Sequence, residues 1–283
     1  MHVGATRPDG KLEPSKTEAV FFPSKPSKCS AQDLVPDRIF FGDSNHFHIH
    51  YTDAFKYLGS HLVPSLSDGY EIDRRLKFAA AQLREMDNTW KSSMDLRSKR
   101  LFFLQIPLNT ALFGCEYWAL TDTLRAKLSV FYHKGLRRIL GLSMHDVEHD
   151  RIRNEHLRNK LGVYDIVDII RYRQSNYIGK LARMPTNRLP RRMLAAWIPT
   201  ARKRGSAPIT TAKTFVNTIQ TILGVDTCTD HGVLKEWVPF AEDKTAWDRL
   251  RINLLSQSRK RSARLGTGML GDPLLPEWLI RMP

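Results

Sequence analysis

The chain has 283 residues, of which 42% are hydrophobic and 10% aromatic, with 16 Gly and 15 Pro. This composition excludes collagen-like and wholly disordered proteins, and the length suits about two compact domains. The 44 Lys and Arg outnumber the 29 Asp and Glu and leave a net charge of +15, which predicts an anionic partner.

The N-terminal segment predicts short strands. Residues 19–22 form an apolar stretch, and residues 38–63 hold apolar runs broken by turn residues such as Gly42 and Asp53. Short apolar runs bounded by Gly, Pro and Asp are typical of strands. We therefore predict a small β-element in this part of the chain.

Three consecutive helices are predicted next. The first begins near Asp68 and carries apolar residues three and four positions apart, which places them on one face. The second, over residues 96–118, contains Pro107, which should kink or split it because proline lacks a backbone donor. The third ends at Gly141, a residue suited to a left-handed C-cap. Four large aromatic residues of these helices are predicted to lie in the core: Trp90, Phe103, Trp118 and Phe131.

Further helices are predicted in the C-terminal half. One covers residues 150–161, next to an acid- and imidazole-rich turn over residues 145–150 that should cap a helix. Another, over residues 166–184, has a clear apolar stripe and ends before a proline. Two more are predicted over residues 210–224 and 234–255. The predicted fold class is therefore mainly α, with a small N-terminal β-element followed by a helical bundle and further helices.

The excess positive charge is concentrated in one part of the chain. From Lys134 to Arg204 there are 17 Lys and Arg but 6 Asp and Glu, a local net charge of +11. Such a field attracts polyanions and gains free energy by releasing their counterions, so RNA, DNA or both are the predicted partners. A solvated basic face that only maintains solubility is the alternative interpretation.

Lys and Arg on helix surfaces bind phosphates without specifying a base sequence. The candidates share a position on or after the helices of the basic part: Arg137, Arg138, Arg171, Arg173, Lys180, Arg183, Arg191, Arg192, Arg202, Lys203 and Arg204. Those between residues 166 and 184 fall outside the apolar stripe of their helix, so we expect them to face solvent. For any one of them, a solvated charge or an internal ion pair is the competing interpretation.

The usual catalytic constellations are absent from the sequence. It contains no Walker loop, no GxGxxG, no GxSxG and no HExxH. It also contains no Asp-Asp dipeptide, whereas polymerase-type phosphoryl transfer holds two cations on neighbouring carboxylates. His46, His48 and His50 share one side of a strand, which suits a solvent-facing role better than a metal site. We therefore predict no catalytic residue, no metal ligand and no resident cofactor.

The cysteines and the hydrophobic pattern bear on where the chain resides. Cys29, Cys115 and Cys228 are far apart and predict reduced thiols rather than a disulfide framework. No apolar run reaches the roughly 18 residues that a membrane span needs, and Asp9 and Glu13 interrupt any secretory leader. We expect no membrane contact and an intracellular location, in the nucleus or the cytoplasm.

Several short strings occur in a fixed order along the chain. They are SKTEAVFFP (15–23), FKYLGS (55–60), DGYEIDRRL (68–76), LFGCEYW (112–118), LRRILGLS (136–143), IRNE (152–155), IGKLARMP (178–185), RLP (188–190) and LKEWVPFAEDKTAWDRL (234–250). Together they resemble the C-terminal part of reverse transcriptases from non-LTR, LINE-like retrotransposons. The resemblance covers most of the chain.

The resemblance implies a division of the chain into four parts. These are a palm remnant with a primer-grip-like β-element (1–66), a thumb-like three-helix region (67–143), basic post-thumb helices (144–200) and a C-terminal linker with further helices and a loosely ordered tail (201–283). In that family the thumb follows the backbone of the template-primer duplex. The resemblance therefore implies backbone binding by the basic helices.

The primer-grip-like strand adds four candidate residues. Lys56, Tyr57, Leu58 and Gly59 correspond to the segment that holds the end of the growing strand in the resembled family. Because strand residues alternate between two faces, at least one of Tyr57 and Leu58 is expected to be core.

Three hypotheses for function follow. In the first, the chain is a C-terminal fragment of a reverse transcriptase that binds template and primer without a polymerase centre of its own. Its metal-binding carboxylates would lie upstream, and Mg²⁺ would be needed only by that missing palm. In the second, the chain is part of an active RNA-directed DNA polymerase and partners the upstream portion. In the third, it is a domesticated helical interaction protein.

Overall fold

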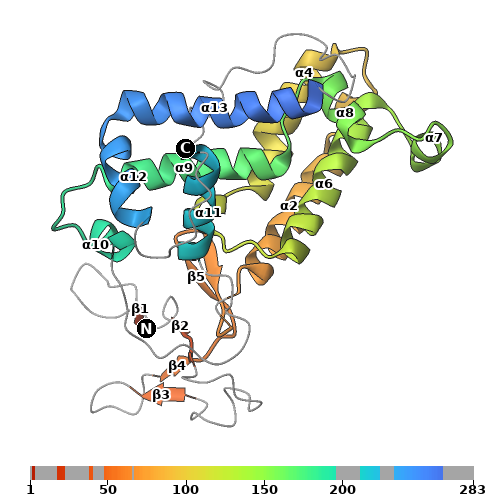
Figure 1. Cartoon of the computed structure of the whole chain (residues 1–283). Coiled ribbons are helices and arrows are strands. Elements are labelled where there is room, and N and C mark those ends of the chain that lie inside the picture. Colours follow the sequence, from red (N-terminus) through yellow and green to blue (C-terminus); the bar gives the residue numbers. More distant parts are fainter. Residues whose placement is uncertain are drawn as a thin grey trace. The chain divides into compact units, whose positions relative to one another are not determined.

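The structure is a computed structural model that describes residues 2–3, 18–22, 38–40, 48–65, 67–195, 211–223 and 233–263. Over these residues the chain is mainly helical, with short strands near the N-terminus (Figure 1). The predicted fold class is therefore confirmed. The chain divides into two compact units, Met1–Arg74 and Arg75–Pro283, and each is described by itself. The four-part division implied by the resemblance stays a prediction.

The first unit is built from antiparallel strand pairs. They are β1 (His2–Val3) with β2 (Glu18–Ala19), β3 (Arg38–Phe40) with β4 (His48–His50), and β5 (Phe55–Tyr57) with β6 (Ser60–Leu62). Ala19 also joins the segment after β4, because its carbonyl accepts a hydrogen bond from the backbone N–H of Thr52 at 2.8 Å. Ala19, Val20 and Ile49 are buried, as expected for short apolar strands.

A buried carboxylate fixes the β5–β6 hairpin to the start of helix α2 (Gly69–Glu85). Glu71 accepts a hydrogen bond from the backbone N–H of His61 at 3.1 Å and one from Arg74 Nη2 at 2.9 Å. The same Nη2 donates to the carbonyl of Gly59 at 3.1 Å. Because a buried charge must be paired and hydrogen-bonded, this arrangement sets the orientation of the hairpin.

The second unit is helical. Its elements after α2 are α3 (Asp87–Lys91), α4 (Leu96–Phe103), η2 (Leu104–Leu108), α5 (Asn109–Ala111), η3 (Cys115–Tyr117), α6 (Asp122–Leu140), α7 (Met144–His149), α8 (Asn154–Leu161), α9 (Ile166–Ala182), α10 (Leu189–Ala195), α11 (Thr211–Leu223), α12 (Val233–Glu242) and α13 (Lys244–Ala263). Helix α9 is the central element and packs against α6, α11, α12 and α13 (Figure 1). The four predicted core aromatic residues are all buried.

Pro107 interrupts its helix as predicted. It lies inside the π-helical turn η2, between α4 and α5. Proline cannot donate to a carbonyl of the preceding turn, and a π-helical bulge is one way for a helix to absorb this defect. The nearby Gly135 lets α6 approach α4, because an added Cβ there would overlap the ring of Phe103.

Helix α6 begins and ends at capping residues that are recognisable in the sequence. Thr121 caps its N-terminus, since its hydroxyl accepts a hydrogen bond from the backbone N–H of Leu124 at 3.3 Å. Gly141 at its C-terminus has φ +67°, which confirms the predicted left-handed cap. The turn after it forms a short helix, α7, in which Ser143 and Asp146 cap each other's backbone N–H groups. The predicted capping role is confirmed, and the following helix starts at Asn154, four residues later than expected.

The helix predicted over residues 234–255 is two helices. Its two halves, α12 and α13, are separated at Asp243. The Asp243 carboxylate accepts hydrogen bonds from the backbone N–H groups of Thr245 at 2.8 Å and Ala246 at 3.2 Å. An aspartate in this arrangement starts a helix, so the local hydrogen bonds favour a break where apolar spacing alone suggested continuity.

Helix α13 docks on α9 through a buried tryptophan. The indole N–H of Trp247 donates to the carbonyl of Ser175 at 2.9 Å, and its ring occupies the space beside Gly179, where an added Cβ would overlap it. One turn further, Arg251 Nε donates to the hydroxyl of Ser175 at 3.0 Å, and its guanidinium lies 4.3 Å from the centre of the Tyr172 ring. Both contacts place α13 along α9 (Figure 1).

Gly179→Ala tests this close approach. A helix interior normally gains about 1 kcal/mol from a Gly to Ala change, but overpacking a core costs about 1–3 kcal/mol. We expect the variant to lose about 1–2 kcal/mol of unfolding free energy in urea titrations. Lys180→Ala, at the exposed neighbouring position, is the control and should stay within about 0.5 kcal/mol of wild type. A Gly179→Ala protein as stable as wild type would contradict the packing described.

Candidate nucleic-acid interface

The basic part of the chain contains a long stretch without acidic residues. Residues 169–225 include eleven Lys and Arg and no Asp or Glu. The stretch covers most of α9 and all of α10 and α11. A polyanion near these helices therefore meets no carboxylate from the stretch itself, which strengthens the local field. Net charge alone did not reveal this feature, although it is visible in the sequence.

Among the residues of this stretch whose side chains the structure describes, three cations are exposed. Lys180 is exposed near the C-terminal end of α9, Arg188 precedes α10, and Arg192 lies on α10. Within the described part of the chain, their side chains have no ion pair or hydrogen bond. Lys180 and Arg192 were predicted site residues, whereas Arg188 was not selected. All three can turn toward a phosphate without breaking a contact to another described residue.

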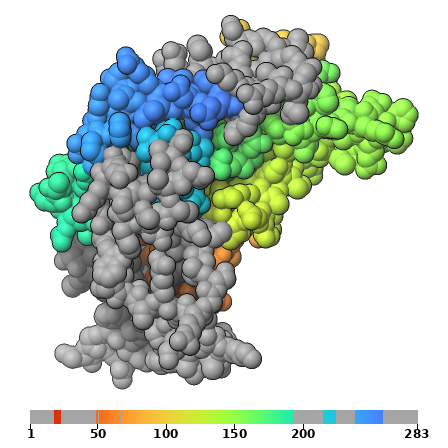
Figure 2. Space-filling model, viewed as in Figure 1, coloured from red at the N-terminus to blue at the C-terminus, as the bar shows by residue number. Residues whose placement is uncertain are grey.

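Two other predicted cations hold the basic helices in place. Arg183 Nη1 donates to the carbonyl of Ala241, at the end of α12, at 2.7 Å. Arg191 Nη2 lies 3.4 Å from a carboxylate oxygen of Glu242. Through these contacts α10 and the end of α9 lie beside α12, as Figure 2 shows for the surfaces of α10 and α12. They orient the surface that carries the exposed cations.

The two arginines at the end of α6 differ in their contacts. Arg138 donates to one carboxylate oxygen of Asp87, from Nε at 3.0 Å and from Nη2 at 2.7 Å. The hydrogen bond from Lys91 and those from Arg138 lower the pKa of Asp87. Arg137 is half-buried in the last turn of α6. Arg138 is therefore engaged within the fold.

The arginines in the middle of α9 lie on different sides of the helix. Arg173 is buried, contrary to the helix-face prediction, and donates to the carbonyl of Leu112 at 3.2 Å and to Asn109 Oδ1 at 3.0 Å. Arg171 is partly exposed and lies 3.5 Å from the carboxylate of the buried Asp168. Arg173 thus stabilises the packing of α9 against the segment around α5 and is unsuited to a surface site.

The hairpin candidates lie in the first unit. Leu58 and Gly59 form the two-residue loop between β5 and β6, with φ +47° and +85°, the positive values of a type I′ turn. Tyr57 is 45% exposed and Leu58 82% exposed, so the expectation that one of them is core is wrong. Lys56 is also exposed. The turn ends the alternation of strand faces, and the apolar tip of the hairpin is left in solvent.

The remaining predictions lie partly outside the described residues. Arg202, Lys203 and Arg204 are there, as are Cys29 and Cys228. Cys115 is buried, and burial raises the pKa of its thiol to about 12. Within the described ranges, no three His, Cys, Asp or Glu side chains are grouped to hold a metal ion. No helix among them is long and apolar enough to cross a membrane.

A buried histidine links α6 to α8 and was not anticipated. His133 Nδ1 lies 2.8 Å from the carbonyl of Ser129, and its Nε2 lies 3.0 Å from Arg158 Nη1. Because arginine only donates, Nε2 accepts and Nδ1 carries the proton. Arg158 is also 3.2 Å from Asp165 and 3.4 Å from Glu155. Burial lowers the pKa of His133, so the neutral ring is the form that fits this network.

This arrangement makes stability depend on pH. The unfolded chain binds a proton at His133 near pH 6.5 whereas the folded chain resists it. We therefore expect the unfolding free energy to fall as the pH drops below about 6.5. The measurement is urea unfolding at several pH values. The variant His133→Gln keeps an acceptor toward Arg158. Its unfolding free energy should change less steeply with pH than that of wild type. Identical slopes in the two proteins would refute the assignment.

Comparison with known proteins adds one relative. A Caenorhabditis elegans protein described as uncharacterized and transposon-derived is 24% identical over 215 residues, which is 75% of this chain and 75% of that protein. No protein-family model matches the sequence. No solved structure matches it either. The similarity indicates a transposon-related origin for the chain.

Proposed function

We propose that the helical unit binds the sugar-phosphate backbone of RNA or DNA, as the thumb-like and post-thumb region of a non-LTR reverse transcriptase-like element. The acid-free stretch over residues 169–225, with Lys180, Arg188 and Arg192 exposed on and beside α9 and α10, is the observation that carries this proposal. The similarity to a transposon-derived protein supports the part of the proposal that relates the chain to a transposable element.

The chemistry of this surface favours backbone contacts over base contacts. Exposed Lys and Arg bind phosphates through charge, and this binding weakens steeply with salt. Base stacking would need exposed aromatic platforms, but in the described part of the acid-free stretch Tyr172 and Phe215 are buried and Tyr177 is half-buried. The expected binding is therefore independent of base sequence.

The hairpin tip supplies a second contact in this proposal. Tyr57 and Leu58 are exposed beside Lys56, so an apolar edge and a cation are available to one end of a strand. The chain would then hold nucleic acid and leave phosphoryl transfer to residues outside it. Nucleotide incorporation by this chain alone, with template, primer, nucleotides and Mg²⁺, would overturn that part.

A charge-matched pair of triple variants tests the location of the interface. We expect Lys180→Gln, Arg188→Gln and Arg192→Gln together to reduce the slope of log affinity against log salt by about 2 to 3 for a duplex. The control is Arg84→Gln, Arg97→Gln and Arg249→Gln, which removes the same charge from exposed positions outside the stretch. Fluorescence anisotropy with a labelled duplex at four salt concentrations gives both slopes.

The outcomes separate the hypotheses. Equal slopes for the two triple variants would mean that net charge, and not this surface, governs binding. Failure of wild type to bind RNA or DNA at low salt would refute the proposal and favour the interaction-protein hypothesis. Melting curves of all three proteins show whether a variant has lost its fold.

A further inference from the structure

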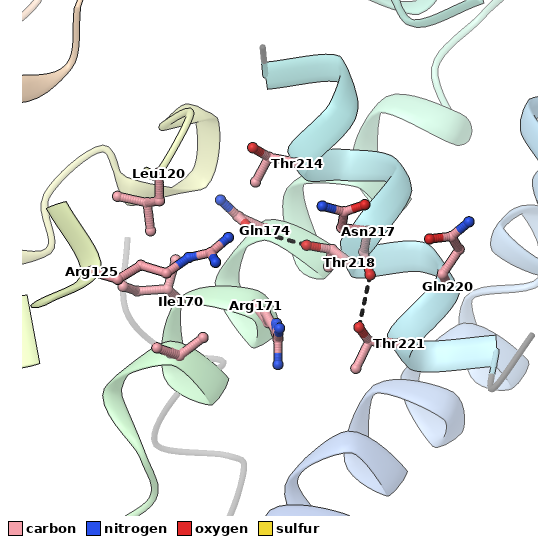
Figure 3. Close-up of a pocket in the computed structure, with 11 residues that line it drawn as sticks. Leu120, Arg125, Ile170, Arg171, Gln174, Thr214, Asn217, Thr218, Gln220 and Thr221 are labelled. Atoms are coloured by element: carbon pink, nitrogen blue, oxygen red, sulfur yellow. Dashed lines mark hydrogen bonds between the residues drawn. The ribbon is translucent and has the colours of Figure 1, made fainter. Parts of the chain in front are cut away.

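A polar groove lies in the helical unit between α9, α11 and the start of α6. Its volume is about 530 Å³, within the range of small-molecule and nucleotide sites. Figure 3 shows Arg125 from α6, Arg171 and Gln174 from α9, and a row of hydroxyl and amide side chains from α11. The members of that row are Thr214, Asn217, Thr218, Gln220 and Thr221.

The inner wall of the groove is held by buried hydrogen bonds. Gln174 Nε2 donates to the carbonyls of Cys115 at 3.3 Å and Trp118 at 3.4 Å. Its Oε1 accepts a hydrogen bond from the hydroxyl of Thr218 at 3.0 Å, which joins α9 to α11 (Figure 3). Both side chains are buried. Because these groups satisfy one another, the wall keeps its shape without a ligand.

The charged residues that line the groove are Arg125 and Arg171, and each has a carboxylate nearby: Asp122 beside Arg125, and the buried Asp168 3.5 Å from Arg171. Among the described residues of the lining there is no Asp or Glu. The partner of Arg125 is Asp122, 3.0 Å away with its side chain 96% exposed, and exposed pairs of this kind contribute little and exchange easily. A guanidinium fork suits phosphate oxygens. Amides and hydroxyls suit the oxygens of a sugar.

We infer that this groove receives one nucleotide unit of a bound strand, with its phosphate toward Arg125 and Arg171 and its sugar toward the amide and hydroxyl row of α11. The inference rests on the proposed function and adds a defined subsite to it. The described residues of the lining include no aromatic side chain, so they offer the base no stacking platform and do not select its identity.

Two variants probe the groove with different chemistry. Arg125→Gln removes a charge whose partner is exposed, so the fold loses no buried pair; Arg171 is avoided because Asp168 beside it is buried. Asn217→Leu keeps the net charge but places an apolar side chain at an exposed position of the lining. Arg249→Gln, an equal charge change on α13 outside the groove, is the control.

The probes are 20-nucleotide single strands of RNA and DNA, with adenosine monophosphate as a separate arm. We expect Arg125→Gln to weaken strand binding about tenfold, because it removes a hydrogen bond to a charged phosphate, and Asn217→Leu to weaken it about threefold, because it removes a hydrogen bond between neutral groups. Arg249→Gln should change it less than about twofold. Only Arg125→Gln should also lower the salt slope, by about 0.7.

Each outcome has a distinct meaning. If wild type binds the strands, and both groove variants bind them with the same affinity as the Arg249→Gln control, this inference is overturned and the proposed function is left intact. Absence of strand binding by wild type would overturn both. If the groove variants lose adenosine monophosphate binding but bind the strands as wild type does, the groove is a site for a free nucleotide. The inference that it receives a nucleotide unit of a bound strand is then overturned. Melting temperatures within about 2 °C of wild type exclude unfolding as the cause.

Discussion

Helix α9 packs in the core on one side and carries solvent-accessible cations on the other. The packing of Trp247 beside Gly179 allows α9 to do both. The missing side chain at Gly179 admits the indole ring, which carries α13 onto the helix. The next residue, Lys180, remains exposed. A larger residue at the glycine would push α13 away and disturb the helix that displays the basic surface.

The sequence predicts local structure well where one residue type determines the outcome. Pro107 interrupts its helix and Gly141 ends another, because a missing donor and a left-handed φ act within a few residues. Arg173 was misplaced because its partners, the carbonyl of Leu112 and the amide of Asn109, are 61 and 64 residues away. Helical spacing carries no information about such a partner, and an arginine outside an apolar stripe is assigned to solvent by default.

The candidate surface could be found from the sequence more readily than the groove. Lys180 and Arg192 belong to an acid-free stretch that is visible in the printed sequence. The groove depends on Gln174 meeting Thr218, 44 residues further on, and on Arg125 facing both helices. Gln174 and Thr218 are neutral and add nothing to the charge pattern of the sequence, and only the packing of α11 against α9 brings them together.

Two of the strings that resemble the retrotransposon family contact each other in the fold. Gly179 and Arg183 belong to IGKLARMP, and Ala241 and Trp247 belong to LKEWVPFAEDKTAWDRL. The indole ring lies beside the glycine, and Arg183 donates to the carbonyl of Ala241 at 2.7 Å. A bulky ring needs the gap that the glycine leaves, and the arginine needs the end of α12 to be close. The strings therefore depend on each other physically, which gives a packing reason for their occurring together in one chain although some fifty residues separate them.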